Sequence, residues 1–209
     1  MKVSTKVKSK GSVNKHLIKI WKNYKKFSTN DERRFDILVP VILSMILVLI
    51  CGLLIHKTTD LITILKEFNS AALTVLAILA GFNTTSLSVI AASNPTFLGK
   101  LYGSNRNKAN NEKSNLLEQT ISFFGYAILI QISLLIFGAV MVFVLGSIAY
   151  SQFIINFEVY TKITLTIITW PWISTVFHSL FISIRNIALL YGYVMLIGQS
   201  NQDKNENSL

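Results

Sequence analysis

The sequence predicts an all-α polytopic membrane protein, in which four transmembrane helices follow a basic amphipathic helix. Charged residues make up only 14% of the 209 residues, against about 25% in a soluble domain. Apolar side chains gather in blocks longer than the roughly 20 residues that cross a bilayer. Eleven of the twenty Lys and Arg precede Phe35, as in a cytoplasmic flank. We therefore divide the chain into a basic segment 1–34, a membrane domain 35–199 and a polar tail 200–209.

The basic segment contains one stretch, 14–27, with helical periodicity. Its apolar residues recur every three or four positions, and its lysines fall mostly on the other side of the helix. Such a helix lies in the headgroup region of anionic lipids, where the residues at the lipid surface would be Lys15, Lys19, Trp21, Lys22, Lys25 and Lys26. The alternative is a loose tail that only fixes the topology. Thr29 and Glu32 then match a capping box that begins the next helix.

Four apolar blocks predict the spans, at about 35–55, 70–93, 121–150 and 172–198. The stretch 56–69 is expected to be a short connector. The last block begins near 163 and is too long for one straight crossing. We therefore place the "WPW" motif at the outer boundary, with Pro171 in the first helical turn, and expect the polar tail to be unfolded.

The distribution of positive charge predicts the orientation. An even number of spans puts both termini on one side, which then carries sixteen Lys and Arg against three on the other side. Cytoplasmic segments of membrane proteins carry this excess. Both termini are therefore expected in the cytoplasm.

Small and polar residues gather at the end of the second span, in "AILAGFNTTSLSVIAASN". Thr84 and Ser88 are four residues apart and form one line on the helix, and Gly81 and Thr85 form a second line. This spacing allows close approach of helices in lipid, within one subunit or between subunits. The alternative is the hydrated lining of a pore. Asn83 cannot easily satisfy its own amide, so we expect it to bond across a helix interface or to water.

Ionisable residues also occur within or beside the spans. Arg185 shares a helix face with His178, and Asp36 and Glu118 belong to the same predicted inner boundary on other spans. A charge at this depth pairs or snorkels to the headgroups, so Arg185 is expected to contact Glu118 or Asp36, or lipid. His178 is interpreted as a hydrogen-bonded residue of the bundle, with proton sensing as the alternative. Gln131 is expected to bond between helices.

The sequence contains no recognisable catalytic, cofactor or metal motif. The three histidines lie in three different environments, and no Gly-rich phosphate loop or nucleophile with a nearby base occurs. The segments outside the spans are too short to bury a catalytic core. The basic charge is concentrated in one flank, which indicates lipid and not direct nucleic-acid binding. We predict a protein that is not an enzyme and has no cofactor.

The stretch "LAGFNTTSLSVIAASNP", the length, the basic amphipathic N-terminus and the four spans together resemble the KwaA family. This family is the membrane component of the Kiwa bacterial anti-phage defence system. The resemblance is architectural and covers most of the chain. It implies a sensor in the bacterial inner membrane and a soluble cytoplasmic effector partner, KwaB.

Two other functions fit the same sequence. One is a small oligomeric ion channel or pore-forming effector lined by the second span. The other is a superinfection-exclusion protein that blocks entry of phage DNA without a partner gene. Four thin helices with a small-residue seam also favour a homo-oligomer.

Overall fold

In the computed structural model, the described residues are 13–93, 116–149 and 158–206, and they form five helices and no strand. Four of these helices are long and apolar enough to cross a membrane, which confirms the predicted all-α polytopic architecture. The helices are α1 (Val13–Phe27), α2 (Asn30–Leu54), α3 (Thr58–Ala91), α5 (Leu116–Ala149) and α7 (Glu158–Glu206).

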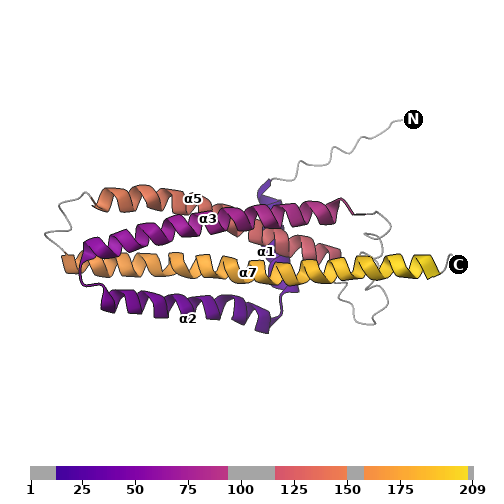
Figure 1. Ribbon diagram of the computed structural model, residues 1–209, viewed down its shortest axis with the longest axis horizontal. Coiled ribbons are helices and arrows are strands. Elements are labelled where there is room, and N and C mark those ends of the chain that lie inside the picture. Colours follow the sequence, from indigo (N-terminus) through magenta and orange to yellow (C-terminus); the bar gives the residue numbers. More distant parts are fainter. Residues whose placement is uncertain (1–12, 94–115, 150–157, 207–209) are drawn as a thin grey trace, which may run out of the picture.

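The four long helices run alternately up and down, and α1 crosses the bundle where α2 begins, with the C-terminal part of α7 extending well beyond it (Figure 1). α3 packs along α5, and α1 crosses α5. α2 packs chiefly against α7, on the side of the bundle away from α3 and α5 (Figure 1). α2 is therefore the peripheral member of the bundle.

The spans expose apolar side chains on the outside, as expected of helices that lipid surrounds. On α2, Leu38, Leu49 and Leu53 are exposed, while Ser44 and Asp36 are buried. The central core joins α3, α5 and α7 through Leu76, Leu134 and Trp172, among others, and α2 contributes Val48 to it. Without water to hydrate it, the backbone must satisfy its own polar groups, and long helices do so.

Several helix boundaries differ from those predicted. α3 begins at Thr58 and not near 70, because Leu61, Ile62 and Leu65 already pack in a core with Met141 of α5. The stretch read as a connector is thus mostly helix. Its start is fixed by Glu158, whose side-chain Oε1 accepts from the Thr58 backbone N–H at 3.3 Å.

The prediction for the last helix was wrong in two respects. Pro171 lies inside the 49-residue α7 and not in its first turn. Proline has no N–H, so the Ile167 carbonyl lacks its helical partner, a loss that helices in lipid tolerate. The Thr175 hydroxyl donates to the carbonyl of Pro171 itself, at 2.6 Å, and does not replace that bond. The helix also continues to Glu206, so most of the tail expected to be unfolded is helical.

Candidate functional site

A buried ion pair joins α2 to α7 near the end of the bundle where α1 lies. Arg185 Nη1 is 2.5 Å from Asp36 Oδ2, and the two side chains are 14% and 4% exposed. The same carboxylate oxygen accepts from the Tyr24 hydroxyl of α1 at 3.3 Å. Three helices thus meet at one carboxylate. We call Asp36, Arg185, Tyr24, Tyr126 and His178 the Asp36 centre.

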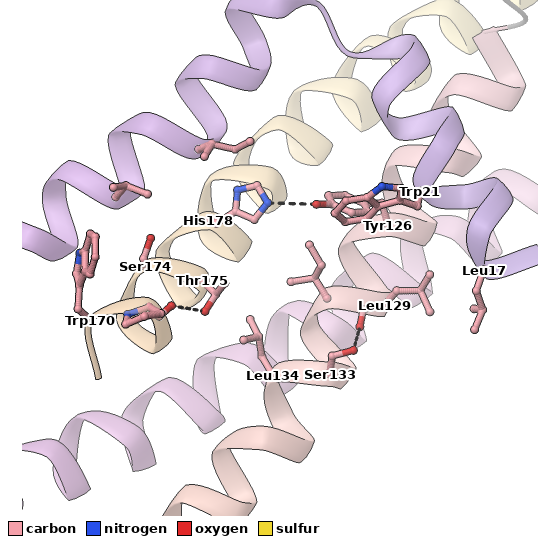
Figure 2. Close-up of a pocket in the computed structure, with 14 residues that line it drawn as sticks. Leu17, Trp21, Tyr126, Leu129, Ser133, Leu134, Trp170, Ser174, Thr175 and His178 are labelled. Carbon is pink, nitrogen blue, oxygen red and sulfur yellow. Dashed lines mark hydrogen bonds between the residues drawn. The ribbon is translucent and has the colours of Figure 1, made fainter. Parts of the chain in front are cut away.

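His178 extends this site toward α5. Its Nδ1 is 2.5 Å from the backbone carbonyl of Asp36, and its Nε2 is 3.4 Å from the Tyr126 hydroxyl; Figure 2 shows the second contact. A carbonyl can only accept, so Nδ1 carries the proton and donates, and neutral Nε2 accepts from the tyrosine. The neutral ring therefore satisfies both of its nitrogens within the bundle.

Aromatic rings surround the guanidinium of Arg185. Its Cζ lies 4.4 Å from the ring centre of Phe123 and 5.2 Å from that of Tyr24. Tyr24 in turn stacks on Tyr126, with 3.8 Å between ring centres. Burial raises the pKa of the Tyr24 hydroxyl above its ordinary value, so this phenol stays a hydrogen-bond donor. The rings supply cation–π attraction in place of water.

A second polar cluster lies at the centre of α3, α5 and α7 and carries no charge. Asn83 Nδ2 donates to Gln131 Oε1 at 3.0 Å and to Ser183 Oγ at 3.3 Å. Asn83 Oδ1 accepts from Asn186 Nδ2 at 3.0 Å, and Gln131 Nε2 donates to Ser183 Oγ at 2.8 Å. All four side chains are at most 1% exposed. We call these four residues the amide cluster.

The structure brings several of the predicted site residues together. It pairs Arg185 with Asp36, one of the two partners expected, and it places the Asn83 and Gln131 amides between helices as expected. Glu118 does not reach Arg185: it lies 3.6 Å from Lys19 Nζ and accepts from Asn23 Nδ2 at 3.1 Å.

The small-residue seam does not pack within the chain. Gly81, Thr84, Thr85 and Ser88 are exposed, whereas Asn83 is buried. Thr84 and Ser88 donate their hydroxyls to carbonyls of their own helix, at 2.7 and 2.9 Å. Asn83 therefore does not share a face with Thr84 and Ser88, and the three residues cannot line one cavity of a single subunit.

The amphipathic helix is present, but the bundle covers part of its apolar face. Ile20 and Tyr24 belong to a core with Phe123 of α5, and the Trp21 ring meets Tyr126 edge-on. The bundle therefore takes up part of the face that was expected to meet lipid, and the placement of the helix in the headgroup region stays a prediction. Trp21 is still 47% exposed, and the lysines point outward: Lys15, Lys19, Lys22, Lys25 and Lys26 are all exposed.

Sequence reasoning missed the partners that complete both polar sites. Tyr24 lies on the apolar side of the amphipathic helix, and neither its hydroxyl nor that of Tyr126 was predicted as a partner. Ser179, Ser183 and Asn186 follow helical spacing on α7 and are all buried. That polar stripe within an apolar helix was the signal that could have identified one half of the amide cluster.

No family model, curated protein or solved structure matches this chain. Within residues 13–93, 116–149 and 158–206, no group of three or more His, Cys, Asp or Glu side chains could hold a metal ion. The geometry defines a multi-pass membrane protein with four helices able to span and two buried polar clusters.

Proposed function

We propose that this chain is the non-enzymatic membrane component of a Kiwa-like anti-phage defence system. It would register infection at the bacterial inner membrane and couple to a soluble cytoplasmic effector. The observation that carries the proposal is the Asp36 centre. There, a helix outside the spans is joined by the Tyr24 hydroxyl to Asp36 of α2, which is itself paired with Arg185 of α7. The resemblance to the KwaA family supplies the biological setting.

The coupling follows from the way α2 is held. α2 packs chiefly on α7 and exposes most of its apolar surface, so a disturbance of the bilayer acts on it directly. A shift of α2 moves Asp36 away from Arg185 and from the Tyr24 hydroxyl together. α1 would then dock on or leave α5, and an effector that prefers one of these states would report the change.

The proposal includes self-association and both termini in the cytoplasm. The exposed stripe of Gly81, Thr84, Thr85 and Ser88 offers a close-packing surface to a second copy. The positive charge at the end that bears α1 supports the orientation. A pore would need this exposed stripe to surround an axis between subunits, since the Asn83 amide is already saturated by protein partners.

Plaque assays on cells that carry this chain and its neighbouring genes test the proposal. We expect Asp36→Asn to abolish protection, because it removes the charge that Arg185 needs. Asp60→Asn is the matched control, since Asp60 is exposed near the other end of the bundle, and it should protect normally. Full protection by the effector gene without this chain would reject the sensor function. Protection by this chain alone would instead indicate superinfection exclusion.

A further inference from the structure

A groove of about 710 Å³ opens between α1, α2, α5 and α7, beside the Asp36 centre. Figure 2 shows its walls, with His178 and Tyr126 on one side and Leu129 and Leu134 on another. Trp21 of α1 and Trp170 of α7 also line it. Ile37 of α2, Ser133 of α5 and Thr175 of α7 complete the part of the lining that bears on its chemistry.

The groove offers hydrocarbon contact and little for a polar ligand. Ser133 donates its hydroxyl to the Leu129 carbonyl at 2.8 Å, and Thr175 bonds to the Pro171 carbonyl. His178 already satisfies both ring nitrogens. The length of the groove along α7, from Trp170 to His178, is about 12 Å at 1.5 Å per residue. One leaflet of hydrocarbon is about 15 Å deep, so the groove accommodates most of the depth of an acyl chain.

Positive charge lies at one end of this groove, on the same face of α2. A smaller hollow there is lined by Asn30, Arg33, Arg34, Ile37 and Leu38. Ile37 lines both cavities, so the hollow adjoins the groove at this residue. Arg33 Nε is buried and has no hydrogen-bond partner within the described residues, while its Nη2 donates to Asn30 Oδ1. The side chain of Arg34 is 80% exposed and lies 4.0 Å from Asp31 Oδ1, an exposed pair that contributes about 0–1 kcal/mol and leaves the guanidinium open to a phosphate.

We propose that the groove binds one anionic glycerophospholipid of the surrounding leaflet. One acyl chain lies between Trp21 and Trp170, and the phosphate lies beside Arg33 and Arg34. An apolar channel that ends at two guanidinium groups is complementary to this class of amphiphile and not to a neutral one. The bound chain would contact Tyr126 and His178 and so brace the Asp36 centre. The binding itself does not depend on the proposed function.

Native mass spectrometry of the full chain in detergent tests this site. Delipidated protein is titrated with dioleoyl phosphatidylglycerol or dioleoyl phosphatidylcholine, and the first bound lipid is counted. Each Arg near the surface favours an anionic lipid by about fivefold, so we expect a preference of about 25-fold for phosphatidylglycerol. Arg33→Gln/Arg34→Gln should bring the preference close to parity. The control Lys15→Gln/Lys22→Gln removes two exposed charges of α1 that do not line either cavity and should retain it.

A second pair of variants tests the groove independently of charge. Ser133→Trp fills the groove and should lower the binding of both lipids severalfold. Ile132→Trp adds the same ring at a neighbouring exposed position outside the lining and should not. Equal binding of the two lipids by the unmodified chain would overturn the proposal. It would also be overturned if the unmodified chain bound no lipid but appeared as a dimer, and if Ser133→Trp alone abolished that dimer, because a second copy would then occupy the groove. Unchanged lipid binding in Ser133→Trp would also overturn it.

Discussion

The two buried polar clusters differ in charge and in the helices that they join. The amide cluster is neutral and joins α3, α5 and α7. The Asp36 centre contains a full ion pair and joins α1 and the peripheral α2 to α7, with Tyr126 of α5 at its edge. One cluster therefore lies among the three helices α3, α5 and α7. The other attaches α1 and the peripheral α2 to α7.

The difference in chemistry suggests a difference in role. Neutral amides in lipid contribute modestly, by about 0.6 kcal/mol per hydrogen bond on average. A buried charge that loses its partner costs about 3–5 kcal/mol, so an ion pair is either closed or broken. Arg185 Nε and Nη2 have no hydrogen-bond partner among the described residues, and the pair is therefore not fully compensated. Such an ion pair is better suited to a contact that opens and closes between two conformational states than to a permanent structural contact.

The largest expected effect comes from separating the ion pair. Arg185→Glu places two acids together and should destabilise the bundle by about 3–5 kcal/mol, measured as thermal unfolding in detergent. Adding Asp36→Arg should recover part of this loss. Adding Glu118→Arg should recover none, since Glu118 pairs with Lys19. Recovery by the second combination alone would mean that the helices are arranged differently.

Asn83→Leu tests the amide cluster and should have a smaller effect. It leaves Gln131 and Asn186 without their partner, at a cost of about 2 kcal/mol for two buried groups. The neighbouring Thr84→Val is the control, because Thr84 is exposed and bonds only to its own helix; it should change stability by less than about 0.5 kcal/mol. Equal losses from the two variants would contradict the placement of Asn83.

A pair of glycine substitutions compares the packing of the two regions directly. A Cβ on Gly138 of α5 would lie 2.7 Å from Leu73 Cδ2 and 3.0 Å from the Trp172 ring, so Gly138→Ala should cost about 1–2 kcal/mol through overpacking. A Cβ on Gly52 of α2 would meet nothing within 4 Å. Gly52→Ala should therefore be neutral or slightly stabilising. Thermal unfolding of both variants measures the contrast, and a larger loss from Gly52→Ala would refute it.

The smallest effect is expected at the surface contact of α1. Lys19 and Glu118 are 68% and 41% exposed, and exposed ion pairs contribute about 0–1 kcal/mol. Lys19→Gln should therefore lower the melting temperature slightly at low salt and not at all at high salt. A large loss that persists at high salt would show that Lys19 and not Tyr24 holds α1 to the bundle.

Patterns that depend on a single helix were predicted well from the sequence. The four spans follow from the apolar blocks, and the capping box of Thr29 and Glu32 has both of its hydrogen bonds. The need of Asn83 for a partner on another helix follows from amide chemistry. Each of these depends on residues close together in the chain.

Features that depend on which helices adjoin could not be predicted. Both Asp36 and Glu118 suited Arg185, and only the packing of α2 on α7 selects Asp36. The periodicity predicts an apolar face on α1, but such a face can be buried either in lipid or against α5, and the sequence does not distinguish the two. The exposure of Gly81 and Thr85 could not be predicted for the same reason. Small residues allow another helix to approach closely, but they do not determine which helix does so.

Cysteine cross-linking of α1 to α5 tests the central claim most directly. An ideal Cβ on Gly125 lies 3.6 Å from the Ile20 side chain, so Ile20→Cys/Gly125→Cys in a Cys51→Ser background should form a disulfide readily in native membranes. Lys22→Cys/Gly125→Cys, which uses an exposed position of α1, is the control and should cross-link poorly. Adding Asp36→Asn should slow the first cross-link severalfold, because α1 loses its attachment to α2 and α7. An unchanged rate with Asp36→Asn would contradict the account.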